Sequence, residues 1–287
     1  MDNRDVRNPV AFSAAGAGPG LSVALEPISS GGVAPAGGAA IDAAELIDRY
    51  IAMWHEPNPE RRREIVTELW ADDGADILRS LDARGYEAIE RRVTRAHEKW
   101  VRDGGFVFRM RGYVGRHHNV VKFNWEMVPV GGGEANSLGF DFFVLSEDGR
   151  IEVLYQFGDP PPPSDEFNQF ADRYVALWNE PDAARRRSAI AALWAEDGVY
   201  IDPANVDRGH REIEAAVAKA YDEFVAKGFV FRSARNADGH HNTVRFNWEM
   251  VPAGGGPVAA VGFDFIVLDD DGRIRSDYQF IEMEPAA

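Results

Sequence analysis

Most of this 287-residue chain is one segment that occurs twice. The stretch DRYIAMWHEP, which begins at Asp48, returns as DRYVALWNEP at Asp172, and HHNVVKFNWEMVP at His117 returns as HHNTVRFNWEMVP at His240. The first pair of stretches lies 124 positions apart and the second pair 123. Such a constant spacing means that the two copies share a fold. The chain therefore predicts two tandem domains of the same architecture.

The composition around the repeat sets the domain boundaries. Residues 1–40 are rich in Gly, Ala and Pro and carry no sustained hydrophobic period, which predicts a flexible tail. We place repeat 1 at 41–159 and repeat 2 at 164–287. The run PPPP at 160–163 predicts a stiff, extended linker between them.

Hydrophobic spacing indicates the same elements in both copies. In repeat 2, apolar residues at helical spacing around Tyr174 predict an amphipathic first helix, and a second helix with a triple arginine runs to Trp194. A short strand at 199–202 stops at Pro203, and a third helix spans about 210–226. Four strand-like runs then follow, separated by GGGP and DDDGR turns. This order predicts an α+β domain with three helices on a curved antiparallel sheet.

The overall composition excludes several classes of protein. The formal net charge of −16 repels phosphate backbones, so we expect no nucleic-acid partner. No run of 18 apolar residues is present and the N-terminus lacks a secretory signal pattern, so we expect no membrane span and a cytoplasmic location. The absence of cysteine excludes disulfides and thiolate zinc sites.

The element order, with RY in the first helix and LWAEDG before the short strand, resembles the nuclear transport factor 2-like (NTF2-like) superfamily. Within it, the chain is most similar to the SnoaL-like polyketide cyclases and the ketosteroid isomerases. The resemblance covers nearly everything after residue 41. It implies two cone-shaped domains, each enclosing an apolar pocket. Many members pair through the outer face of the sheet, so it also implies an internal pseudo-dimer, with a homo-oligomer as a further option.

The resemblance to the ketosteroid isomerases assigns three polar positions in that pocket. Repeat 2 matches all three, with Tyr174 and Asp264 as oxyanion donors and Asp202 as the general base. In repeat 1, Tyr50 and Asp141 match, but Leu78 stands at the base position. Asp76 lies two residues earlier on the same strand face and is a weak substitute. We therefore expect the chemistry in repeat 2.

Structural explanations stand beside these assignments. Tyrosine on a core-facing helix position is usually packing, Asp-Pro is ordinary turn chemistry, and Asp264 has His240, His241 and Arg245 as alternative partners. Adjacent strand residues point to opposite faces, and the apolar face that His240 shares with Phe246 and Trp248 is expected to line the cone. The pocket-lining candidates are Trp178, Trp194, His240, Phe246 and Trp248 in repeat 2, and Tyr50, Trp54, Trp125 and Asp141 in repeat 1.

Two hypotheses follow for the function. The first is a cofactor-independent isomerase or cyclase that performs acid–base chemistry next to the carbonyl of a small apolar ligand, with no metal. The second is a non-catalytic module that captures a ligand or binds a partner. The loss of the base in repeat 1, where most other repeated motifs persist, favours the second.

Overall fold

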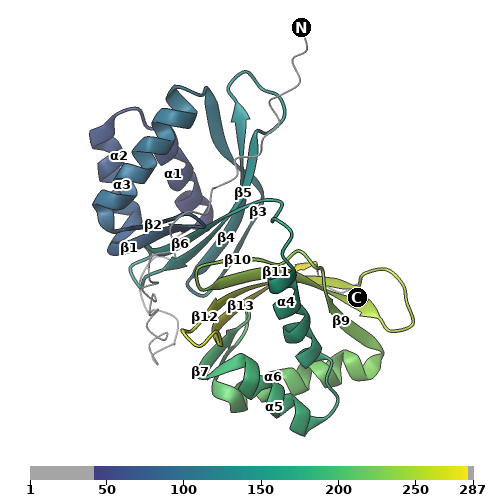
Figure 1. Ribbon diagram of the computed structural model, residues 1–287. Coiled ribbons are helices and arrows are strands. Elements are labelled where there is room, and N and C mark those ends of the chain that lie inside the picture. The colour runs from purple at the N-terminus through teal and green to yellow at the C-terminus, as the bar shows by residue number, and fades with distance from the viewer. Residues whose placement is uncertain (1–41, 284–287) are drawn as a thin grey trace. The chain divides into compact units, whose positions relative to one another are not determined.

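The computed structural model describes residues 42–283, so the predicted tail at 1–40 lies outside the described residues. The chain divides into two compact units after Gly158, close to the boundary that the prolines at 160–163 predict. Each unit contains its own helices and its own sheet (Figure 1). The two units are described separately below.

Repeat 1 contains three helices and six strands. Asp42 caps α1, because its side chain accepts a hydrogen bond from the Ala44 backbone N–H at 2.9 Å, and Asn58 caps α2 in the same way. A π-helical turn at His97–Arg102 extends α3. The elements are α1 (Ala43–His55), α2 (Pro59–Leu69), β1 (Trp70–Leu78), β2 (Leu81–Arg84), α3 (Gly85–Ala96), β3 (Phe106–His117), β4 (Val120–Pro129), β5 (Ser137–Leu145) and β6 (Ile151–Gly158).

Repeat 2 has the same order of elements, with one strand divided into two. Ser164 and Asp182 cap its first two helices. Its elements are α4 (Asp165–Trp178), α5 (Ala183–Leu193), β7 (Trp194–Ile201), β8 (Val206–Arg208), α6 (Gly209–Glu223), β9 (Phe229–Ser233), β10 (Asp238–His240), β11 (Thr243–Pro252), β12 (Ala260–Leu268) and β13 (Ile274–Met283). The predicted α+β class is confirmed for both repeats.

Each sheet contains the predicted antiparallel meander and is mixed, because one further strand pairs in parallel. The last four strands of each repeat form the expected meander, but β1 runs parallel to β6 and β7 runs parallel to β13. The third helix carries the chain from this parallel strand to the far edge of the meander, and such a crossover allows parallel pairing. The strand orders are β2-β1-β6-β5-β4-β3 and β10-β11-β12-β13-β7-β8.

The strand before the third helix is longer than predicted. It begins at Trp194, where the sequence predicts the end of a helix. The four residues AEDG between Trp194 and Val199 interrupt the regular pairing with β13, and the register shifts there. After Ile201 the chain turns back, and the short strand β8, which was not predicted, pairs with β7. This turn holds Asp202, which the sequence placed at the end of the strand.

The cores lie between the helices and one face of each sheet (Figure 1). In repeat 2, apolar residues of α4 pack with Val244, Phe246 and Ile266 of the sheet. Asp141 and Asp264 lie at the same point of each core, in the middle of β5 and β12. No helix within residues 42–283 is both long enough and apolar enough to cross a membrane.

Candidate functional site

Five polar side chains of repeat 2 gather on the inner face of its sheet. Asp264 of β12 pairs in register with Gln279 of β13, and Asp277, two residues earlier on β13, pairs with Tyr200 of β7. Paired residues of neighbouring strands share a face, so all four side chains enter the same core. Tyr174 reaches the group from helix α4. Asp264 and Asp277 are completely buried.

Hydrogen bonds divide this polar group into two pairs. The Tyr174 hydroxyl donates to Asp277 Oδ2 at 2.5 Å, and the Tyr200 hydroxyl donates to Gln279 Oε1 at 2.7 Å. Asp264 belongs to neither pair. Hydrogen bonds from Trp248 and Gln279 favour its charged form, although their geometry is not ideal. It receives no hydrogen bond from a tyrosine, which makes Asp264 the most informative group of the site.

Burial raises the pKa of both carboxyls of repeat 2. Burial raises the pKa of Asp277 to about 7, although the hydrogen bond from Tyr174 lowers it. The pKa of Asp264 rises well above its usual range, mainly through burial and further through the neighbouring charge of Asp277. Two acidic groups in one apolar core cannot both ionise without a counter-charge. At neutral pH the core of repeat 2 therefore holds at least one carboxylic acid, which can donate a hydrogen bond.

Asp202, the predicted base, lies outside this buried group. It follows β7 and is half-buried. Its Oδ1 accepts hydrogen bonds of 2.7 Å from the backbone N–H groups of Ala204 and Asn205, and the Asn205 amide contacts both carboxylate oxygens. Asp202 is thus a turn-forming aspartate, as the structural explanation proposed. It still lies close enough to Tyr200 for its charge to raise the pKa of that phenol.

Repeat 1 holds the corresponding aspartate in a complete hydrogen-bond network. Asp141 accepts hydrogen bonds from the Tyr50 hydroxyl at 2.8 Å, the Trp125 indole at 2.9 Å and the Gln156 amide at 3.0 Å. Burial raises its pKa to about 6, while these three donors lower it. The tyrosine of the first helix therefore binds the mid-strand aspartate directly in repeat 1, which it does not do in repeat 2.

A buried arginine completes the network of repeat 1. Arg92 of α3 donates to Gln156 Oε1 at 2.7 Å, and its Nε lies 2.9 Å from Asp76 Oδ2. Its guanidinium also lies over the Trp54 ring, 4.6 Å from the ring centre, in the range of a cation–π contact. Burial raises the pKa of Asp76 to about 6, although Arg92 lowers it. Asp76 is therefore an ion-pair partner in a closed network.

Repeat 2 replaces this ion pair by different side chains at the same positions. Ala216 stands where repeat 1 has Arg92, and Tyr200 stands where it has Asp76. Tyr200 packs near Trp178, with ring centres 5.3 Å apart, and donates to Gln279, two contacts that Arg92 makes in repeat 1. Repeat 2 has its second buried carboxyl on the neighbouring strand, at Asp277. The buried cation of repeat 1 thus has no equivalent at this position in repeat 2.

Most of the predicted lining residues lie in the cores. Trp178, Trp194, Phe246 and Trp248 belong to the core of repeat 2, and Tyr50 and Trp54 to that of repeat 1, against which Trp125 packs. The sequence missed three residues that define the difference between the sites, namely Arg92, Tyr200 and Asp277. Comparing LYQF in repeat 1 with DYQF in repeat 2 gives the one available signal for Asp277, an acidic residue that appears within an apolar strand.

The prediction that His240 lines the cone was wrong. His240 ends β10 and pairs with Thr243, while Val244 pairs with Gly239, so His240 lies on the sheet face opposite to Val244. The neighbouring His241 has a positive φ of 53° in the hairpin turn, and its ring packs against that of His240. The prediction assumed one unbroken strand through the histidine pair, and the tight turn between β10 and β11 reverses its phase.

One glycine in each repeat faces a tryptophan on the neighbouring strand, and we expect the stability of the repeat to depend on it. Gly262 pairs with Trp248 across β11 and β12, and a Cβ added at Gly262 would overlap the indole ring. Gly139 and Trp125 have the same arrangement in repeat 1. We expect Gly262→Ala to destabilise repeat 2 by about 1–3 kcal/mol through overpacking. Urea unfolding measures this loss. Gly254→Ala, where an added Cβ meets open space, is the control, and an equal loss in both variants would contradict the overlap.

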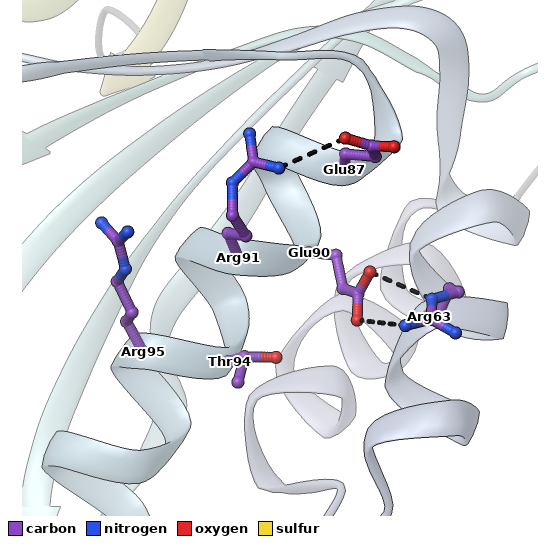
Figure 2. Close-up of a pocket in the computed structure, with 6 residues that line it drawn as sticks. All are labelled: Arg63, Glu87, Glu90, Arg91, Thr94 and Arg95. Carbon is purple, nitrogen blue, oxygen red and sulfur yellow. Dashed lines mark hydrogen bonds and ion pairs between the residues drawn. The ribbon is translucent and has the colours of Figure 1, made fainter.

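Charged side chains of repeat 1 line a surface groove (Figure 2). Its charges largely pair with one another, since Arg63 binds Glu90 and Arg91 binds Glu87. The groove is lined by charged and polar residues alone, and none of its titratable groups is buried, which argues against a catalytic role. Within residues 42–283, no group of three His, Asp or Glu side chains is arranged to hold a metal ion.

The sequence of repeat 2 is similar to a known protein family. Residues 171–276 match the SnoaL-like domain. A candidate isomerase of the SnoaL-like family from Agrobacterium tumefaciens is 34% identical over 42% of this chain and 99% of its own, with a TM-score of 0.39. An NTF2-like protein of unknown function from Exiguobacterium is 18% identical over 40% and 98% of the two chains, with a TM-score of 0.32.

A candidate polyketide cyclase from Sinorhizobium meliloti is 13% identical over 40% of this chain and 96% of its own, with a TM-score of 0.32. Among curated proteins, none matches the sequence. The SnoaL-like match covers most of repeat 2, and the identity to the Agrobacterium protein extends over almost the whole of that protein. The chain therefore belongs to the SnoaL-like family.

Proposed function

We propose that repeat 2 is a small-molecule isomerase or cyclase site that moves a proton next to a carbonyl group. The observation that carries this proposal is Asp264, a completely buried carboxyl with a raised pKa to which the core tyrosine does not donate. A carboxylic acid in an apolar core is a good donor to the oxygen of an enolate, because that oxygen gains charge in the transition state. The SnoaL-like candidate isomerase from Agrobacterium supports the same class of reaction.

In this proposal each group has one task. The Asp202 carboxylate removes a proton from the carbon next to the carbonyl, the electron pair moves to the carbonyl oxygen, and Asp264 donates a hydrogen bond to that oxygen. In a substrate with a neighbouring carbon–carbon double bond, the electron pair then returns from the oxygen, the double bond shifts next to the carbonyl, and Asp202 delivers the proton to the far carbon of that double bond. Tyr174 donates to Asp277, which holds the phenol away from Asp264. The core is sealed around Asp264, so substrate entry requires its aromatic side chains to move.

Hydrogen–deuterium exchange at carbon tests the proposal without knowledge of the natural substrate. A panel of apolar cyclic ketones is incubated with the protein in D₂O, and mass spectrometry follows deuterium uptake next to the carbonyl. We expect Asp202→Asn to slow exchange by about 10²–10⁴-fold, the usual contribution of a general base. The asparagine still accepts the hydrogen bonds of the turn, so the fold is retained.

Asp269→Asn is the matched control. Asp269 also forms a turn, accepting from the backbone of Asp271 and Arg273, but it lies in the hairpin between β12 and β13. We expect this variant to exchange at the wild-type rate. If Asp202→Asn does so as well, Asp202 is not the base.

A ligand-binding module is the second candidate. The turn around Asp202 favours it, because the carboxylate already accepts two backbone hydrogen bonds and needs no catalytic role to explain its position. This candidate predicts that ketones of the panel bind to the protein, as measured by isothermal titration calorimetry, without any deuterium uptake. Exchange that depends on Asp202 would eliminate it.

A further inference from the structure

Asp277 is the residue that changes the partner of the core tyrosine between the two repeats. In repeat 1, Tyr50 donates to the mid-strand Asp141 at 2.8 Å. In repeat 2, the equivalent Tyr174 donates to Asp277, and the mid-strand Asp264 receives no hydrogen bond from it. Leu154 of repeat 1 stands at the position of Asp277. Leu154 is paired with Asp76 on the neighbouring parallel strand, and Asp277 is paired with Tyr200, the residue that replaces Asp76.

The register explains why one tyrosine cannot serve both carboxyls. Asp264 pairs with Gln279, and Asp277 lies one step further along the same face, opposite Ile266. The two carboxyls are therefore diagonal neighbours on adjacent strands. A phenol has a single hydrogen to donate, so a bond to Asp277 removes the donor that closes the network in repeat 1.

We propose that Asp277 is a positioning residue that draws Tyr174 away from Asp264 and so leaves the Asp264 carboxyl available to a ligand oxygen. This inference deepens the proposed function and rests on it, since it explains how a closed structural network became an open acid–base site. Tyr200 assists by occupying the Gln279 oxygen, which Arg92 occupies in repeat 1. The substrate class that fits is a compound with one carbonyl oxygen as hydrogen-bond acceptor.

Two variants of Asp277 separate this role from a simple effect of charge. Asp277→Asn removes the charge but keeps an oxygen that accepts from Tyr174. Asp277→Leu installs the residue of repeat 1 and removes the acceptor, so Tyr174 is free to bind Asp264. In protein labelled with ¹³C at the aspartate carboxyls, NMR titration gives the ionisation midpoint of Asp264, assigned by its loss in Asp264→Asn. We expect a lower midpoint in Asp277→Leu than in Asp277→Asn, because only the former gives Asp264 a tyrosine donor.

A tyrosine pair gives an independent measurement if Asp277→Leu fails to fold. Tyr50→Phe should raise the midpoint of Asp141, because it removes a donor to the carboxylate. Tyr174→Phe should not raise the midpoint of Asp264, because Tyr174 donates to Asp277 instead. Equal midpoints in the two Asp277 variants, or a change at Asp264 in Tyr174→Phe as large as that at Asp141 in Tyr50→Phe, would overturn the inference.

The ketone exchange assay distinguishes failure of this inference from failure of the proposed function. We expect Asp277→Asn to retain carbon exchange and Asp277→Leu to lose it by at least tenfold, because the network closes on Asp264. Wild-type exchange in Asp277→Leu would contradict the positioning role. If the wild-type protein exchanges no ketone, the proposed function fails, whereas the NMR titration still decides the role of Asp277.

Discussion

Removing the guanidinium of Arg92 is expected to destabilise repeat 1 by about 3–5 kcal/mol, the usual cost of leaving a buried charge without its partner. Asp76 is completely buried, and its Oδ2 lies 2.9 Å from Arg92 Nε. In Arg92→Ala, no water replaces the guanidinium easily, and Gln156 Oε1 loses its donor as well. The Asp76 carboxyl must then take up a proton or remain charged in an apolar core, and both outcomes lower the free energy of unfolding.

Amide hydrogen exchange of the peptides that cover β1 and β6 measures this loss within repeat 1. Arg63→Ala is the control, because Arg63 binds Glu90 with two hydrogen bonds but is 62% exposed. An exposed pair contributes about 0–1 kcal/mol. Adding Asp76→Leu to Arg92→Ala should restore part of the stability, since the unpaired charge is gone. Equal losses in Arg92→Ala and Arg63→Ala would show that the buried pair has no special weight.

The repeat pattern predicted the domain architecture because both copies carry the same local signals. Helical periodicity, the cap residues Ser164 and Asp182 and the glycine-rich hairpins all lie in the sequence itself. The parallel pairing of β7 with β13 does not, because it depends on where the third helix returns the chain. The same limit applies to β8, which forms only because the turn at Asp202 brings the chain back beside β7.

The site was predictable residue by residue only where the two repeats agree with the family pattern. Tyr174 and Asp264 do enter one core, as the pattern implied. Their hydrogen bonds were not predictable. The buried carboxyl of Asp76 in repeat 1 is replaced in repeat 2 by that of Asp277 on the neighbouring strand, and the core tyrosine donates to Asp277 there. Such a change appears in the sequence as two unrelated substitutions. Only the strand register shows that they occupy neighbouring positions.

The buried carboxyls of repeat 2 are expected to make its stability fall as the pH rises. Burial raises the pKa of Asp277 to about 7, so the folded state holds a proton that the unfolded state releases near pH 4. The stabilising contribution of this proton is complete below about pH 4 and is lost as the pH rises to about 7. For one carboxyl, a difference of about three pH units corresponds to a loss on the order of 4 kcal/mol.

Asp277→Asn should remove the part of this slope that Asp277 contributes and leave the part that Asp264 contributes, because the amide stays neutral at every pH and still accepts the hydrogen bond from Tyr174. The measurement is amide hydrogen exchange of β12 and β13 between pH 4 and pH 8, corrected for the intrinsic pH dependence of exchange. Repeat 1 gives an internal reference, since burial raises the pKa of Asp141 only to about 6 and β5 should therefore lose less protection. Parallel profiles for the wild type and Asp277→Asn would mean that Asp277 is already ionised in the fold. Tyr174 would then be fixed as a donor to Asp277, and the phenol could take no part in binding a substrate oxygen.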